Sequence, residues 1–129
     1  MSEKNVPSAL RTWFEVHFVA DVAFAIPLMF APEFTLRLFG WQTIDPIATR
    51  IVAAALFAIG IESWLGRNAG VEAYKGMLNL KIIWSAAVVL GAGASLLSGA
   101  QGAPLMGWAV MAVFLFFNLV WVYWRRKLM

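Results

Sequence analysis

The residues best able to do chemistry in this sequence are a few ionisable and amide side chains that stand inside long apolar stretches. Asp21 and His17 are four residues apart. This spacing stacks two side chains on one face of a helix, where the carboxylate can hold the imidazole charged or fix its tautomer. A charge near the middle of a bilayer costs about 2.5–3.5 kcal/mol, so each one needs a reason. At about 1.5 Å per residue, Asp21 lies roughly 13 Å inside the first apolar stretch and is the deepest acid.

Two further polar side chains are expected at a similar depth in other stretches. Glu62 lies near the end of the second stretch, and Asn118 lies roughly 10 Å inside the fourth. With His17 and Asp21 they form one polar layer drawn from three helices. Two interpretations of this layer stay open: a hydrogen-bonded network that fixes helix register, or a hydrated cavity that binds a ligand or handles protons.

Lys81 joins this layer only under one placement of the third helix. If the helix begins at Val71, the amine can meet Asp21; if it begins near Ile82, the amine extends to the lipid headgroups. We favour the headgroup placement, because a lysine in hydrocarbon is costly.

The elements that must position these residues are membrane helices. The chain is 62% hydrophobic and 13% charged, against about 45–50% and 25% in soluble domains. The apolar residues form long runs separated by short polar stretches. These runs predict an all-α membrane protein, a four-transmembrane-helix bundle in a single domain, residues 1–129. The expected spans are residues 12–31, 46–65, 77–97 and 104–124.

Two connections carry local signals. Asp45-Pro46 is a helix start, with an N-cap carboxylate followed by proline at the first helical position. The segment from Pro32 to Gly40 is either a short amphipathic helix along the membrane interface or an ordinary loop.

Basic residues and tryptophans give the orientation. Lys and Arg are retained on the cytoplasmic side of a membrane, and tryptophan prefers the headgroup level. Both place the N- and C-termini in the cytoplasm. We expect a multi-pass protein of the cell inner (plasma) membrane. The basic residues at the cytoplasmic ends are Lys4, Arg11, Arg67, Lys75, Arg125, Arg126 and Lys127, and the tryptophans there are Trp13, Trp64, Trp84, Trp121 and Trp124.

Small residues at four-residue spacing indicate where helices approach closely in lipid. Ala54 and Ala58 form one stripe on the second span, and Ala87, Gly91 and Ser95 form another on the third. We expect these stripes to pack the two spans together. The alternative is a homo-oligomer that forms through Ala87, Gly91 and Ser95.

Several classes of site and partner are disfavoured. The chain has no cysteine and one histidine, so no metal site and no cofactor is expected. It has no nucleophile–base motif and no phosphate loop, which makes an enzyme the less favoured class. Its Lys and Arg flank apolar runs, so we expect the lipid bilayer as a partner and no nucleic acid.

A pattern of small residues, glycine and a helix start resembles the small four-helix bacterial membrane proteins of the DoxX-like families. The resemblance covers about a quarter of the chain and implies the four-helix architecture and little about activity. It runs through Leu36-Arg37-Leu38-Phe39-Gly40, Asp45-Pro46, Arg50 and Ala53-Ala54-Ala55-Leu56 to Gly60-Ile61.

The leading functional hypothesis is a protein that binds or transports a lipophilic or cationic small molecule through a polar cavity in the cytoplasmic half. Asp21 would be the counter-charge and His17 its pH-sensitive neighbour. The alternatives are an accessory or assembly subunit of a membrane complex, and a small membrane enzyme acting on a lipid, with Asp21 or Glu62 as acid and His17 as base. The aromatic walls of the cavity are predicted to be Trp13, Phe14, Trp64 and Trp121.

Overall fold

The computed structural model describes residues 5–129, and Lys4 lies outside this range. All regular secondary structure in the described residues is helical, with no strand among them. Its elements are α1 (Ser8–Phe30), α2 (Pro32–Leu38), α3 (Pro46–Leu65), α4 (Val71–Leu97), a short 3-10 turn η1 (Ala100–Gly102) and α5 (Leu105–Lys127).

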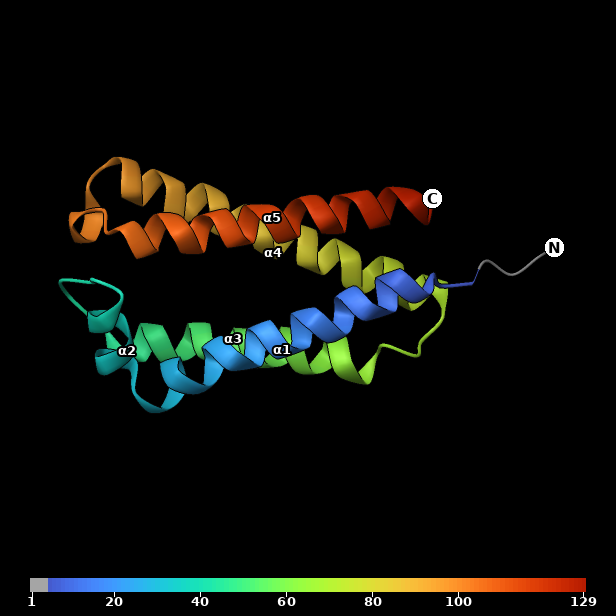
Figure 1. Ribbon diagram of the computed structural model, residues 1–129, viewed down its shortest axis with the longest axis horizontal. Helices are drawn as coiled ribbons and strands as arrows, with labels where there is room; N and C mark the ends of the chain where they lie inside the picture. Colours follow the sequence, from blue (N-terminus) through green and yellow to red (C-terminus); the bar gives the residue numbers. More distant parts are fainter. Residues whose placement is uncertain (1–4) are drawn as a thin grey trace.

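Four of these helices, α1, α3, α4 and α5, are long and apolar enough to cross a membrane. They run up and down in turn, so that α1 begins and α5 ends at the same end of the bundle (Figure 1). We call this the termini end and the opposite one the α2 end. The four long apolar helices indicate a multi-pass membrane protein.

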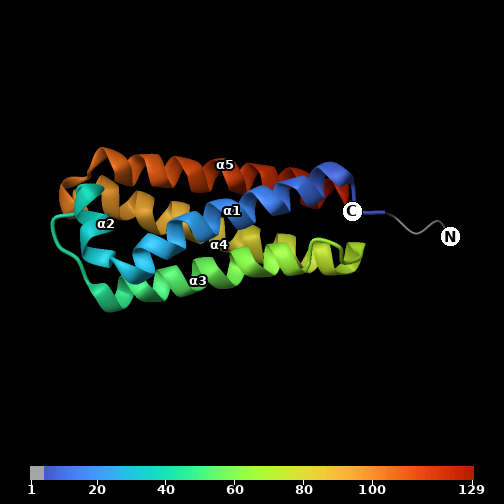
Figure 2. The ribbon, with the colours of Figure 1, turned by 60° about the horizontal axis from the view of Figure 1, so that its bottom comes forward.

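The long helices pack as two pairs. α1 packs against α3, and α4 packs against α5, as Figures 1 and 2 show together. The expected packing of the second span on the third through small residues is therefore wrong. Ala54, Ala58, Ala87, Gly91 and Ser95 are all exposed, because the partner of α3 is α1.

The two pairs meet at the termini end in an aromatic core. The Phe14 and Tyr74 rings lie 4.4 Å apart, and the edge of Trp121 meets Phe14 at 5.8 Å. The Tyr74 hydroxyl and the Arg11 guanidinium both donate to the carbonyl of Arg67, which ties the α3–α4 connection to this core. The core comprises Val6, Leu10, Phe14, Tyr74, Leu78, Trp121 and Leu128.

The helix that carries Lys81 begins at Val71, earlier than the expected start at residue 77. Gly70 stands at its N-cap with extended backbone. A salt bridge between Glu72 and Lys75, with N···O 2.8 Å, links the first turn. The buried Tyr74 anchors this turn in the aromatic core, so tertiary packing makes a polar stretch helical.

The predicted helix start at Asp45-Pro46 is confirmed. Asp45 Oδ1 accepts hydrogen bonds from the backbone N–H groups of Ile47 and Ala48, at 2.9 and 3.2 Å. The preceding segment is helical, as α2, rather than a loop. The helix ends at Leu38, with Phe39 as its C-cap, and Gly40 follows with φ +94°, a left-handed conformation that favours glycine just after a helix end.

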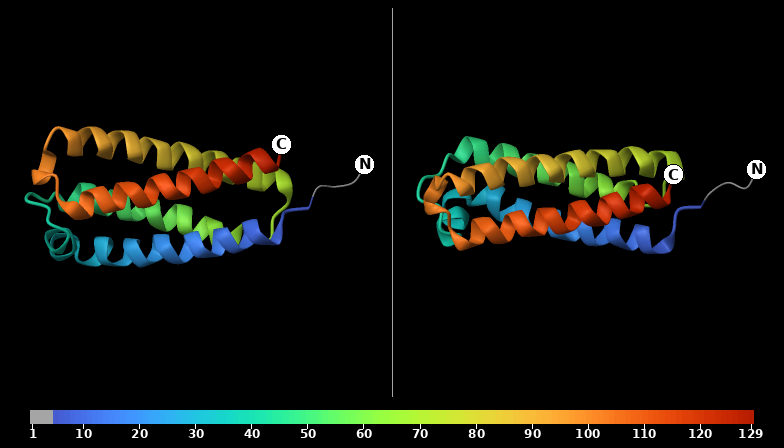
Figure 3. Two further views of the ribbon diagram at one scale, coloured as in Figure 1. Left: turned by 45° about the horizontal axis from the view of Figure 1, so that its top comes forward. Right: turned by 90° about the horizontal axis from the view of Figure 1, so that it is seen from above.

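At the α2 end a side-chain clasp joins the two pairs. Gln101, in η1, accepts from the backbone N–H groups of Gln42 and Thr43 at 2.8 Å each and donates to the Thr43 hydroxyl at 2.9 Å. Its own φ is +58°, a strained value for a non-glycine residue. Figure 3 shows the two loops side by side at this end. The pairs are thus held together at both ends of the bundle.

Close approach within the α1–α3 pair depends on Gly60. A Cβ atom built on Gly60 would lie 2.7 Å from the Cβ of Asp21, closer than two carbon atoms can pack. Only a glycine lets α3 pass Asp21 at this distance.

We therefore expect Gly60→Ala to destabilise the protein by about 1–3 kcal/mol, because the extra methyl group overpacks the helix pair. Gly76→Ala is the matched control, since a Cβ there would meet nothing within 4 Å. Reversible unfolding in detergent micelles measures both. Equal stability of the two variants would contradict this account of Gly60.

Candidate functional site

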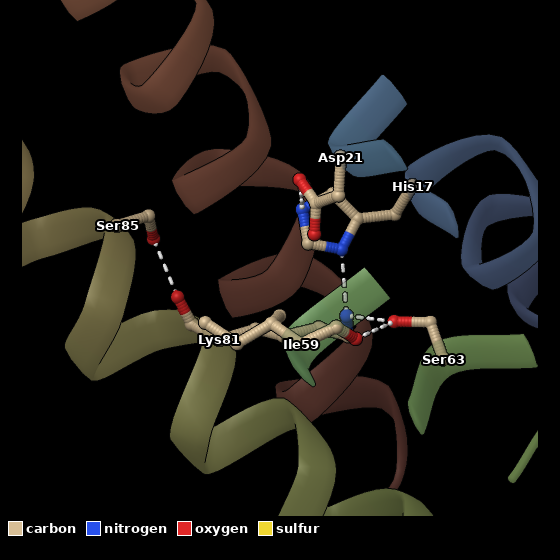
Figure 4. A network of polar contacts seen from close by, with 6 residues as sticks. All are labelled: His17, Asp21, Ile59, Ser63, Lys81 and Ser85. Carbon is tan, nitrogen blue, oxygen red and sulfur yellow. Dashed lines mark hydrogen bonds and ion pairs between the residues drawn. The ribbon is translucent and has the colours of Figure 1, made fainter. Parts of the chain in front are cut away.

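The centre of the bundle holds a chain of hydrogen bonds that runs from α1 through α4 to α3 (Figure 4). His17 Nε2 lies 3.2 Å from Asp21 Oδ1, and His17 Nδ1 lies 2.6 Å from the amine of Lys81. An ionised carboxylate only accepts hydrogen bonds, so Nε2 carries the imidazole proton and Nδ1 accepts from the amine. All three residues are buried, with exposed fractions of 4%, 6% and 2% for His17, Asp21 and Lys81. We call His17, Asp21 and Lys81 the central triad.

The Lys81 amine occupies a cage suited to an ammonium ion. It donates to the Ser63 hydroxyl at 2.5 Å, and that hydroxyl donates to the carbonyl of Ile59 at 2.7 Å. The amine also lies 4.8 Å from the centre of the Phe14 ring and 5.1 Å from that of Trp121, within the range of cation–π attraction.

The placement of Lys81 at the lipid headgroups is therefore wrong. Its exposed fraction is 2%. The amine turns inward because α4 begins at Val71, which places residue 81 in the middle of a helix rather than at its start. Inside the bundle the amine finds His17, Ser63 and two aromatic rings, so the cost of leaving water is offset locally.

A second set of polar contacts links α4 to α5. The Asn118 amide donates to the Ile82 carbonyl at 3.1 Å and to the Ser85 hydroxyl at 3.0 Å. Ser85 in turn donates to the carbonyl of Lys81 at 2.7 Å. Asn118 lies on α5, about one turn from the central triad. The polar contacts therefore involve all four long helices.

Some predicted site residues lie elsewhere. Glu62 is exposed on α3, because its neighbour Ser63 occupies the inward-facing position. Trp64 is also exposed, with the Arg67 guanidinium 3.7 Å from its ring centre. Trp13 packs on Phe116 at the side of α5, with ring centres 5.9 Å apart.

A cavity of about 380 Å³ lies between the two helix pairs, within the size range of small-molecule sites. His17 and Asp21 stand at one end of it, and Phe39 and Trp41 stand at the other. Most of its wall is apolar. The lining comprises His17, Ala20, Asp21, Phe24, Leu28, Leu36, Phe39, Trp41, Ala48, Thr49, Val52, Leu56, Trp84, Ser85, Met106, Ala109, Val110, Val113, Phe114, Phe117 and Trp121.

The cavity extends toward the α2 end, whereas the sequence placed it in the half of the bundle that holds the termini. The large rings of Phe14, Tyr74 and Trp121 fill the space at the termini end. Small residues such as Ala20 and Ala109 line the other half, so the space between the pairs stays open there. Of the four predicted aromatic walls, only Trp121 lines this cavity.

Two buried polar atoms in residues of the cavity wall lack a hydrogen-bond partner within residues 5–129. They are Asp21 Oδ2 and Trp84 Nε1. Unpaired buried polar groups cost about 1–3 kcal/mol each. Both atoms have almost no accessible surface, and Asp21 Oδ2 lies toward α3, 3.5 Å from the position of a Cβ atom on Gly60.

Sequence reasoning missed Ser63, Ser85 and Trp84. Ser85 lies four residues after Lys81, so a helix that starts at Val71 stacks the two on one face. Ser63 had a weaker signal, because hydroxyl groups are common in membrane helices. Trp84 was interpreted only as an interfacial residue, although it lies one turn beyond Lys81.

No protein-family model, no curated protein and no solved structure matches this chain. The resemblance to the DoxX-like families therefore stays a prediction, and the function is inferred from the geometry of the site.

The central triad predicts strong coupling between its charges. Asp21→Asn should cost about 3–5 kcal/mol of stability, because it leaves the buried Lys81 ammonium without a counter-charge. Adding Lys81→Met to that variant should recover a large part of the loss, since no unpaired charge then remains. Reversible unfolding of the single and double variants tests this. Additive losses would show that the two charges do not compensate each other.

Proposed function

We propose that this protein binds a lipophilic small molecule in the cavity between its helix pairs, with the polar part of the ligand at Asp21. The observation that carries this proposal is the combination of an apolar cavity with a buried acid, Asp21, in the wall at one end of it. An apolar wall favours a lipophilic body. The carboxylate supplies a specific polar contact at one end of the cavity.

We further propose that the four spans form a bundle in the plasma membrane with both termini in the cytoplasm. The basic residues at the termini end, among them Arg125, Arg126 and Lys127, support this orientation. The cavity then lies in the half of the bundle that faces away from the cytoplasm. Its lining includes exposed side chains of both pairs, such as Phe24 and Val113, so a ligand dissolved in lipid has a lateral route to it.

Self-association through Ala87, Gly91 and Ser95 is a second proposal. All three are exposed on α4, and a Cβ atom on Gly91 would meet nothing within 4 Å. This face is free of the contacts that hold α4 to α5, so an accessory or assembly role can coexist with ligand binding.

A substitution that fills the cavity tests the binding proposal. The fluorescent probe N-phenyl-1-naphthylamine should bind the wild-type protein in nanodiscs, above the background of empty nanodiscs. Ala109→Phe should weaken this binding by about tenfold or more, because the ring occupies the cavity. Ala112→Phe is the matched control, as Ala112 is exposed on the same helix and outside the lining. Equal binding by both variants would place the probe elsewhere.

The orientation is testable because the chain has no native cysteine. Single cysteines at Gln101 and at Lys127 should label oppositely in intact cells with a membrane-impermeant maleimide. We expect labelling at position 101 and none at position 127 until the membrane is permeabilised. The reverse pattern would invert the proposed topology.

A further inference from the structure

We propose that α5 carries a binding site for an anionic phospholipid on its outward face, at the termini end of the bundle. The site is an open groove, which we call the α5 groove. Its lining comprises Leu119, Val122, Tyr123, Arg126 and Lys127. None of these residues lines the cavity between the helix pairs, so this site goes beyond the proposed function and does not depend on what the cavity binds.

The order of side chains along the α5 groove matches the order of groups in a phospholipid. The lining residues are three or four positions apart, so they stand on one face of the helix. Leu119 and Tyr123 are exposed on the apolar part of the span, with exposed fractions of 61% and 53%. Arg126 and Lys127 are exposed where α5 ends, about 10 Å further along the axis. Hydrocarbon is therefore followed by positive charge, as an acyl chain is followed by a phosphate.

The charges of Arg126 and Lys127 are not used inside the protein. Within residues 5–129, neither side chain takes part in a hydrogen bond or an ion pair. The other basic side chains described at this end have acceptors. These contacts are Arg11 with the Arg67 carbonyl, Arg67 with the Trp64 carbonyl, Lys75 with Glu72, and Arg125 with Asn79. The two unused cations are thus adjacent to each other and both line the α5 groove.

Tyr123 links the apolar and the basic parts of the α5 groove. The Lys127 amine lies 5.5 Å from the centre of the Tyr123 ring, within the range of cation–π attraction. The ring keeps the amine on the same face as Arg126, and the Tyr123 hydroxyl can donate a further hydrogen bond. A phosphate at this level would meet two cations and a hydroxyl group.

An anionic phospholipid suits both parts of this face. The guanidinium of Arg126 matches the fork of two phosphate oxygens. Two neighbouring cations attract a headgroup with a net negative charge more strongly than a zwitterionic one, whose own ammonium they repel. A soluble acidic partner could meet Arg126, but it could not reach Leu119, which lies within the membrane-spanning helix.

Lipid binding to the full chain in detergent micelles, measured by native mass spectrometry, tests the proposal. Dioleoylphosphatidylglycerol should bind about tenfold more tightly than dioleoylphosphatidylcholine, which has the same chains and no net charge. Arg126→Gln should weaken binding of the anionic lipid by about fivefold and leave the zwitterionic lipid unchanged. Equal binding of the two lipids by the wild-type protein would overturn the proposal.

Arg125→Gln is the matched control, since it makes the same change of charge one residue away. The Arg125 guanidinium donates to Asn79 Oδ1 at 2.8 Å and is not part of the α5 groove. This variant should therefore weaken binding of the anionic lipid by less than about twofold. An equal loss in the two variants would show attraction to the total charge of this end and refute a site on the outward face.

A headgroup without chains tests the role of the apolar part. Glycerol 3-phosphate in large molar excess should leave the bound dioleoylphosphatidylglycerol in place, because it gains nothing from Leu119 and Val122. Displacement of the lipid would identify a site for free phosphate groups and overturn the assignment to a phospholipid.

Discussion

The structure depends on the neutralisation of one lysine inside a membrane bundle. The Lys81 amine is surrounded by groups from three other helices: His17 on α1, Ser63 on α3 and Trp121 on α5. Because an unpaired ammonium in hydrocarbon is costly, the buried amine is stable only while these contacts surround it. Gly60 lets α3, which carries Ser63, pass close to Asp21, and the early start of α4 at Val71 places Lys81 inside a helix rather than at its beginning.

The central triad separates a fully packed region of the bundle from a region with a cavity and two unpaired polar atoms. Toward the termini, the central triad rests on a filled aromatic core. Toward the α2 end, the same residues face a cavity, and Asp21 Oδ2 and Trp84 Nε1 lack partners within the described residues. The apolar cavity at this end, with Asp21 in its wall, is the physical basis for proposing a ligand.

The sequence predicted the four long helices well, because run length and apolar content suffice for that. It also placed His17, Asp21 and Asn118 at the level where the polar contacts lie. It failed for Lys81, because tertiary packing extends α4 back to Val71, and for Glu62, because depth alone does not say which face of a helix points inward. The cavity was predicted at the wrong end of the bundle. Most polar residues lie in the termini half, but the large rings of Phe14, Tyr74 and Trp121 fill that half. The positions of charged residues do not show how side-chain volume fills the space between helices.

The division into two helix pairs has a consequence for assembly. The α1–α3 pair carries Asp21, His17 and Ser63, and the α4–α5 pair carries Lys81. Each hairpin on its own exposes to lipid an ionisable group whose complement is held by the other. The buried lysine and its hydrogen-bond acceptors therefore make the association of the two helix pairs specific. A pair that is inserted without the other leaves an ionisable side chain unpaired in lipid.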